Sequence, residues 1–403
     1  MSNVSWAQGD GPLACFADGY RAELRRLGFT HNSVVIHLVL MGQLSRWMSQ
    51  VGVVVGDLTE GRLEGFFDVR RAGGQRRVPT ARSLVPLFGY LRNNGVIPPP
   101  EAVSSTPLED LLKRYRCHLL DDRGLAASTV LNYEGRARRF LSERILAGSG
   151  ETGVEGLCGA DVNGFLLREC SRLSVGSAKN RVNDLRSLLR FLYLEGLIRS
   201  DLAEAVPPVA GWRDTGLAPR LATSEVAELV SSCDRSRPTG LRDFAIMMLL
   251  ARLGLRSCEV VRLELDDIDW RAGELTVRGK GGRVDRLPLL NDVGEALAAY
   301  LHDGRPRAES RKVFLASLAP QRALGPGSVN SVVRRACERT GRDPVGPHRL
   351  RHALATELLA QGATLPQIGQ VLRHRGLATT GAYAKVDLAG LRSVAQPWPG
   401  GER

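Results

Sequence analysis

Residues 346–362, GPHRLRHALATELLAQG, predict an amphipathic helix that carries two anion-binding side chains at its start. His348 and Arg351 are three residues apart, so they share one face of a helix. Leu350 and Leu354 lie on the opposite stripe, which we expect to face a hydrophobic core. An HxxR pair is weak evidence by itself, because such pairs occur by chance in many helices. Other segments must therefore show which anion the two groups would meet.

A second segment, LGLRSCEVVRL (253–263), offers another well-placed cation. Arg256 lies between a glycine-containing turn and a predicted helix that Ser257 can cap. Glu259 can hold this arginine in place by an ion pair. We therefore expect the Arg256 side chain to extend from a rigid, well-packed backbone position.

A third segment, GELTVRGKGGRVDRLPL (273–289), predicts two short strands joined by a glycine-rich turn. Lys280 is the only lysine of this hairpin, and the turn allows an extended arm to bend toward a ligand. The last segment, LRHRGLATTGAYAKV (372–386), contains His374 and, nine residues later, Tyr383.

In order and spacing, these four segments resemble the signature boxes of the tyrosine recombinases, or phage integrase family. The resemblance covers about residues 108–395, and six matched positions make it highly specific. Cys258 replaces a residue that is often serine in the family, and Arg283 one that is often lysine. Residues 1 to about 100 exceed the common two-domain plan of the family.

The resemblance implies a metal-free site around a scissile DNA phosphate, with Tyr383 as the nucleophile; Glu259, through its ion pair with Arg256, would support this site. The groups that would surround the phosphate are Arg256, Lys280, His348, Arg351 and His374. It also implies a mainly α, multidomain fold, in which helical bundles of the SAM-like core-binding type precede a mixed α+β catalytic domain with a small antiparallel sheet. The core-binding and catalytic domains would close as a clamp around double-stranded DNA.

The chemistry of phosphodiester cleavage requires the same residue types. The negative charge on phosphodiester oxygens grows as a fifth bond forms, and two arginines can stabilise that growth without a metal or another cofactor. A tyrosine hydroxyl, with a pKa of about 10, needs help to lose its proton at neutral pH. His348 is the candidate base, Lys280 the candidate acid for the departing 5′-oxygen, and His374 a hydrogen-bond donor to the phosphate.

Each of these residues also has a purely structural interpretation. Arg256 and Glu259 suit a surface ion pair, and Lys280 suits an exposed turn. His374 suits a helix end, and Tyr383 suits a half-buried aromatic position. If all of these structural interpretations were true, the six matches to the family would be coincidences that occur in the right order.

The bulk composition agrees with a nucleic-acid partner. The 403 residues carry a net charge of +12, and the part after residue 212 holds 29 Lys and Arg against 21 Asp and Glu. The seven cysteines form no CxxC pair, so neither a zinc site nor a disulfide framework is predicted. No apolar run reaches the roughly 18 residues of a membrane span, and no signal peptide begins the sequence, so we expect a cytoplasmic protein without a membrane partner.

Two proline-rich stretches predict the domain organisation. We expect an N-terminal helical module at 1–100, a core-binding helical domain at 105–206, a linker at 207–219, a catalytic domain at 220–395 and a tail at 396–403.

The first two helical segments look like copies of one module. LTEGRLEGFF (58–67) matches LCGADVNGFL (157–166), and SLVPLFGYLRNNGVI (83–97) matches DLRSLLRFLYLEGLI (184–198). Gly196 of the second copy lies where a C-cap glycine belongs. Chance similarity between amphipathic helices is the alternative.

Basic side chains of the second copy and of the hairpin are candidate DNA contacts, although a solvated helix face explains any one of them equally well. They are Arg136, Arg138, Arg139, Lys179, Arg181, Arg186 and Arg283.

The predicted function is therefore site-specific DNA recombination, for the integration, excision or transposition of a mobile element. A swap between two duplexes needs a tetramer on two DNA sites, and accessory recombinases or DNA-bending proteins are further candidate partners. One alternative is an enzyme like type IB topoisomerases; DLAGLRSV (387–394) argues against it, because such a tail helix often docks on a neighbouring protomer in the recombinase family. The other alternative is a catalytically silent DNA-binding protein of the same fold.

Overall fold

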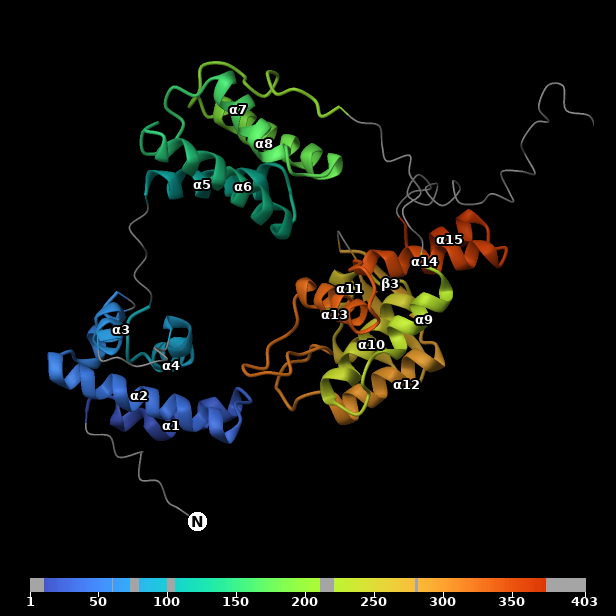
Figure 1. Ribbon diagram of the computed structural model, residues 1–403, viewed down its shortest axis with the longest axis horizontal. Coiled ribbons are helices and arrows are strands. Elements are labelled where there is room, and N and C mark those ends of the chain that lie inside the picture. Colours follow the sequence, from blue (N-terminus) through green and yellow to red (C-terminus); the bar gives the residue numbers. More distant parts are fainter. Residues whose placement is uncertain are drawn as a thin grey trace, which may run out of the picture. The chain divides into compact units, whose positions relative to one another are not determined.

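The computed structural model describes residues 11–59, 61–72, 80–99, 106–210, 221–279 and 282–374. The chain divides into two compact units, residues 100–215 and the remainder (Figure 1). The described residues are mainly helical, with one three-stranded antiparallel sheet in the order β1-β2-β3. This confirms the predicted fold class.

The first helical module has a hydrophobic core of its own, built from residues between Leu13 and Ile97. Thr30 caps the longest of its helices, because its hydroxyl accepts a hydrogen bond from the backbone N–H of Ser33. Its four helices are α1 (Ala17–Arg26), α2 (His31–Val51), α3 (Leu63–Ala72) and α4 (Ala81–Asn93).

The unit of residues 100–215 also has a separate core and, among its described residues, four main helices, shown in teal and green in Figure 1. They are α5 (Pro107–Cys117), α6 (Ala127–Leu146), α7 (Gly159–Cys170) and α8 (Val175–Leu194). A π-helical turn, His118–Asp122, continues α5 and leads to Arg123.

The two modules bury equivalent residues at equivalent places. Tyr20 of α1 and Tyr115 of α5 are both buried. Tyr20 packs on Tyr90 with ring centroids 5.7 Å apart, and Tyr115 packs on Phe191 at 5.0 Å. Since Tyr90 and Phe191 are paired in the sequence alignment above, the tertiary contact supports the predicted duplication.

The ends of α4 and α8 match as well. Gly95 and Gly196 take φ angles of 67° and 69°, which favour glycine. The following N–H groups, of Val96 and Leu197, each bond to a carbonyl five residues earlier at 2.9 Å. Both helices therefore end in the same Schellman-type motif, as predicted for Gly196.

The C-terminal part, residues 221–374, packs its helices around α10, which is buried along most of its length. The sequence FAIMMLLARLG (244–254) explains this burial, because a helix that is apolar on all sides is stable only inside a core. The helices are α9 (Thr223–Ser231), α10 (Pro238–Arg252), α11 (Ser257–Arg262), α12 (Asn291–Ala299), α13 (Pro326–Arg339), α14 (Pro347–Ala360) and α15 (Leu365–Val371).

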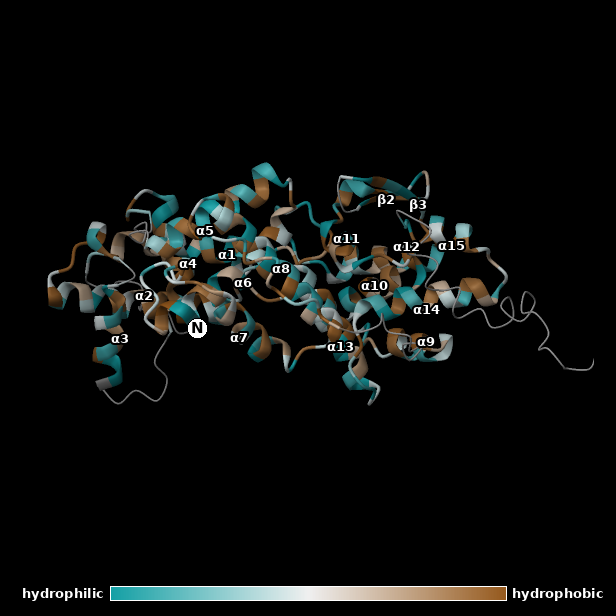
Figure 2. Cartoon of the chain, turned by 90° about the horizontal axis from the view of Figure 1, so that it is seen from above, coloured by the Kyte–Doolittle hydropathy of each residue, from teal (hydrophilic) through white to brown (hydrophobic). Residues whose placement is uncertain are grey.

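The predicted hairpin forms the small sheet. Strands β2 (Glu274–Arg278) and β3 (Val284–Pro288) pair antiparallel, and β1 (Ile268–Asp269) adds a short third strand that the sequence did not predict. Figure 2 shows apolar and polar residues alternating along the helices, as expected where each helix buries one face.

Parts of the predicted domain plan lie outside the described residues, namely most of the linker at 207–219 and the tail at 396–403. Within the described ranges, no helix combines the length and the apolar character that a membrane span needs.

Candidate active site and polar groove

Arg351 joins three parts of the C-terminal fold. It lies in the second turn of α14, and only 1% of its surface is exposed. Its guanidinium donates hydrogen bonds to the main-chain carbonyls of Gly254, just after α10, and Leu372, just after α15. The side chain is therefore held in a fixed plane by two segments that are distant in sequence.

Gly254 makes this approach possible. Its φ angle is 57°, and a Cβ placed there would lie 2.9 Å from Leu372 Cδ2 and 3.1 Å from Leu354 Cδ2. A side chain at this position would crowd these two leucines and would strain the left-handed backbone.

Arg256 occupies the N-cap position of α11, so the expectation that Ser257 caps the helix was wrong by one residue. The cap is supplied by Glu259. Its carboxylate accepts one hydrogen bond from the backbone N–H of Arg256, at 2.9 Å, and another from Nη1 of the Arg256 guanidinium, at 2.6 Å. A carboxylate three residues into the helix satisfies an unpaired N–H better than a hydroxyl at the first helical residue can. One side chain thus fixes both the backbone and the guanidinium of Arg256.

Glu259 is itself buried and is shared with a second arginine. Arg373 Nη2 lies 3.0 Å from Glu259 Oε2. Burial alone would raise the pKa of Glu259, but the Arg256 backbone N–H and the charges of Arg373 and Arg256 outweigh it, and the pKa stays below its usual range. The carboxylate is therefore ionised at neutral pH. Arg373 was not predicted as a site residue.

Three histidines line the same region. His348 is exposed, and its ring packs edge-on against His352 at 4.4 Å between centroids. His374 lies three residues after the end of α15, and its backbone N–H bonds to Gly369 O at 2.9 Å. His352 was not predicted, although its spacing of four residues from His348 places both on one helix face.

All three imidazoles are biased toward the neutral form. Desolvation, together with the charges of Arg351 and Arg256, lowers the pKa of His374 to about 4. Desolvation and the same two arginines also lower the pKa of His348. A neutral His348 can accept a proton at physiological pH, as a general base must.

We expect His374 to titrate near pH 4 in the DNA-free protein. In an Arg256→Ala variant its pKa should rise, because the positive charge of Arg256 no longer repels the protonated imidazole. Since the folded pKa lies below the unfolded value of about 6.5, stability should fall as the pH drops from about 6.5 toward 4. NMR of histidine-labelled protein, assigned with His374→Asn, measures the pKa. Titration of His374 near 6.5, or no change in the Arg256→Ala variant, would contradict the expectation.

Lys280 and Tyr383 lie outside the described residues. The residue before Lys280 is described, however, and it lies next to the cluster. A Cβ at Gly279 would be 3.9 Å from Glu259 Oε1, and its backbone N–H bonds to Arg283 O at 2.7 Å. The hairpin end that carries Lys280 therefore starts beside the group that holds Arg256.

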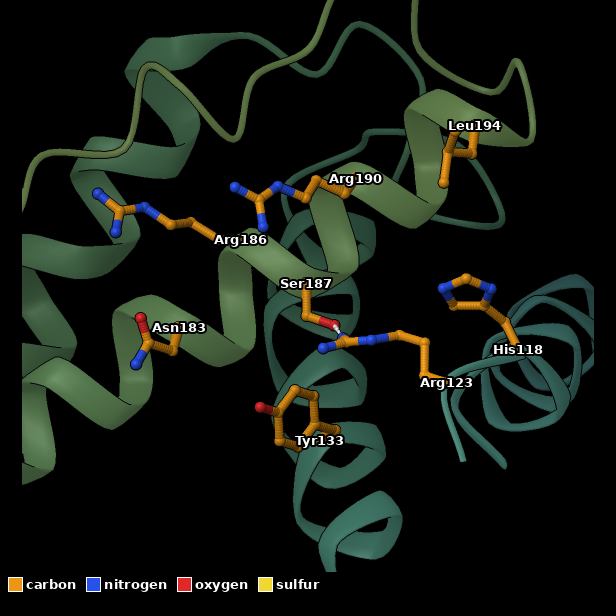
Figure 3. Close-up of a pocket in the computed structure, with 8 residues that line it drawn as sticks. All are labelled: His118, Arg123, Tyr133, Asn183, Arg186, Ser187, Arg190 and Leu194. Atoms are coloured by element: carbon orange, nitrogen blue, oxygen red, sulfur yellow. Dashed lines mark hydrogen bonds between the residues drawn. The ribbon is translucent and has the colours of Figure 1, made fainter. Parts of the chain in front are cut away.

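A polar groove of about 550 Å³ lies on the unit of residues 100–215 (Figure 3). Figure 3 shows Arg123 reaching across to α8, where its Nη1 donates to Ser187 Oγ at 2.6 Å. Tyr115 fixes the same serine from the core side, by a hydrogen bond of 3.1 Å. The lining residues are His118, Arg123, Tyr133, Asn183, Arg186, Ser187, Arg190 and Leu194.

The groove contains three arginines and no carboxylate among its lining residues. Only Arg186 was predicted as a DNA contact, and it also donates to Val206 O at 2.7 Å. Asn183 and Arg190 were missed. Their spacing with Lys179 and Arg186, at intervals of four, three and four residues on one helix, is the signal that would have found them.

The other arginines predicted to contact DNA lie in ion pairs within the protein. Arg136 pairs with Asp184, and Arg138 with Glu109 and Glu134. Glu169 holds both Arg139, at 2.7 Å, and Arg181, at 3.4 Å. Arg283 pairs with Asp285 at 2.7 Å, and Lys179 is half-buried on α8. These partners reduce the net charge that such arginines offer to DNA.

Known proteins with similar sequences indicate the family to which this chain belongs. A model described as the Phage integrase family matches residues 219–389. A putative integrase/recombinase, y4rA, of Sinorhizobium fredii is 42% identical over 396 residues, which cover 97% of this chain and 96% of that protein. The tyrosine recombinase XerD of Mycobacterium tuberculosis is 35% identical over 309 residues, or 72% of this chain and 96% of that protein.

Solved structures share the fold. The post-cleavage complex of the XerH site-specific recombinase with a palindromic difH substrate gives a TM-score of 0.53 at 20% identity, covering 74% of this chain and 86% of that one. A lambda integrase dimer bound to a COC′ core site gives 0.52 at 20% identity, covering 68% and 94%. With the sequence matches above, the chain belongs to the phage integrase family and is a tyrosine recombinase.

Proposed function

We propose that this recombinase cleaves and rejoins specific DNA sites through a covalent 3′-phosphotyrosine on Tyr383. The observation that carries the proposal is the meeting of two arginines and a neutral imidazole, Arg256, Arg351 and His374, in one cluster, brought together from the start of α11, from α14 and from just after α15. Such a cluster suits a phosphate whose negative charge increases during the reaction.

The proposed chemistry balances without an external energy source. The Tyr383 oxygen attacks the phosphorus and its proton passes to His348, while the bond from phosphorus to the 5′-oxygen breaks and Lys280 protonates that oxygen. Arg256 and Arg351 bind the two remaining phosphate oxygens. The phosphotyrosine keeps the bond energy, so a 5′-hydroxyl of another strand can reverse the steps and rejoin the DNA without ATP or a metal ion.

We also propose that the groove of Figure 3 contacts the DNA backbone. Its three arginines attract phosphates, and Arg190 has no hydrogen-bond or ion-pair partner within the described ranges. Asn183 and Tyr133 add polar groups that can donate to phosphate or to base edges. DNA-bound complexes of the structural neighbours agree with a nucleic-acid partner.

Arg190→Ala is expected to weaken DNA binding and to reduce the slope of log K against log salt by about 1, because one phosphate contact is lost. Fluorescence anisotropy with a labelled duplex at several salt concentrations measures both quantities. Arg199→Ala, which removes an exposed arginine of the same unit outside the groove lining, is the matched control. Equal slopes for the two variants would exclude the groove as a phosphate site.

The first module, residues 13–97, is proposed to be a second copy of the core-binding domain with a different task. In the alignment above, Arg186, Ser187 and Arg190 of the groove correspond to Val85, Pro86 and Gly89, so the copy lacks two of the groove's three arginines. We therefore assign DNA binding to the second copy. Integration, excision or transposition of a mobile element by a tetramer on two DNA sites is the proposed process, supported by the likeness to y4rA and to a lambda integrase tetramer bound to a Holliday junction (TM-score 0.50).

A suicide substrate nicked near the cleavage site tests the proposal. Wild-type protein should form a covalent adduct that protease removes, and it should exchange strands between two duplexes that carry the site. Relaxation of supercoils without exchange would favour the alternative of a topoisomerase-like enzyme. Tight DNA binding with no adduct would favour a catalytically silent DNA-binding protein.

A further inference from the structure

Arg373 has an unusual backbone conformation directly beside the active site. Among the described residues it is the one non-glycine with a positive φ angle, 55°, and it immediately precedes His374. A side chain makes this left-handed conformation unfavourable, so the surrounding structure must hold it there.

The side chain of Arg373 shows what holds it. It is 3% exposed, and its Nη2 pairs with Glu259 Oε2 at 3.0 Å. Longer hydrogen bonds, of 3.3 to 3.4 Å, run to the carbonyls of Leu253, Gly254 and Val371. The guanidinium thus links the Gly254 turn, the end of α15 and the carboxylate that caps α11.

The charge of Arg373 matters for the neighbouring arginine. Glu259 holds Arg256 through both carboxylate oxygens, and an unbalanced carboxylate there would compete with a phosphate for that guanidinium and repel the phosphate. Arg373 balances the carboxylate from the buried side. Arg256 keeps its orientation while its charge remains available to the DNA.

We propose that Arg373 is a positioning residue for strand cleavage: its ion pair with Glu259 sets Arg256, and its left-handed backbone sets the His374 ring. The inference rests on the proposed phosphotyrosine chemistry. It assigns to this chain a buried arginine, one residue before the histidine, that acts through two phosphate-binding groups without touching DNA itself.

Arg373→Gly separates positioning from backbone strain, because glycine suits a φ of 55° and relieves the strain. A merely structural role predicts an unchanged or more stable protein that cleaves normally. Positioning predicts a single-turnover cleavage rate about 10- to 100-fold lower, as expected when catalytic groups shift slightly, with the duplex affinity within about twofold of wild type.

Two further variants test the charge. Arg373→Lys keeps the ion pair with Glu259 and should restore most of the rate, whereas Arg373→Met keeps the bulk without the charge and should not. Arg252→Ala, which removes an exposed arginine paired with Asp292 in the same domain, is the matched control and should cleave normally.

Cleavage by Arg373→Gly within about twofold of wild type, or equal rates for the lysine and methionine variants, would overturn the inference. If the glycine variant does not fold, the cleavage rates of Arg373→Lys and Arg373→Met still test whether Arg373 acts by positioning. An absence of adduct with wild-type protein would instead overturn the proposed function, so the two failures are distinguishable.

Discussion

Tyr383→Phe is expected to abolish the covalent adduct while leaving duplex affinity unchanged. The change removes one oxygen, which in the proposed chemistry is the only atom of this side chain that bonds to phosphorus. Arg256 and Arg351, the proposed phosphate-binding residues, are retained, so the DNA should still bind. A nicked suicide substrate, analysed on a denaturing gel, measures the adduct, and anisotropy with the same duplex measures the affinity.

The matched control for this prediction is Tyr193→Phe, which removes the hydroxyl of an exposed tyrosine on α8. That variant should form adduct at the wild-type rate. Adduct formation by Tyr383→Phe would mean that another residue is the nucleophile, and the assignment of Tyr383 would then be abandoned.

Arg351→Ala is expected to slow cleavage by at least about 10²- to 10³-fold, with a much smaller change in DNA affinity. The lost interaction strengthens as charge develops on the phosphate, so its removal acts mainly on the transition state. Rate constants of adduct formation at saturating protein, set beside dissociation constants, separate the two effects. A tenfold or smaller loss of rate would contradict the assigned role.

Arg351 also stabilises the fold, and this contribution must be measured separately from its effect on the cleavage rate. Its alanine variant leaves the carbonyl of Leu372 without the Arg351 donor, and that of Gly254 with only the longer hydrogen bond from Arg373, at a cost of about 1–3 kcal/mol for an unsatisfied buried group. Urea unfolding at neutral pH measures this loss. Arg351→Lys keeps the charge but cannot bind two oxygens in parallel, so we expect a partial loss of rate.

Much of the fold could be predicted because its signals are local. The buried helix α10, the hairpin of β2 and β3 and the glycine-ended helix α8 all follow from spacing within one segment. The catalytic candidates could be named for a related reason: four short segments in the right order resemble one family, and each segment positions its side chain by nearby caps and turns.

The tertiary structure decided which distant groups meet. Arg351 bonds to Gly254, 97 residues away, and Arg373 pairs with Glu259, 114 residues away. No periodicity or spacing in the sequence specifies such partners, so Arg373 could not be found before the fold was known. For the same reason, the arginines predicted to bind DNA could not be sorted in advance. Arg136 meets Asp184 on another helix, whereas Arg190 lines the groove.

The sequence by itself therefore determined the helical class, the order of the chemical groups and the family. Only the folded chain determined which charges are balanced inside the protein and which remain to meet a phosphate. The physical reason is that a charge acts over a few ångströms of space, and folding alone decides which residues come that close.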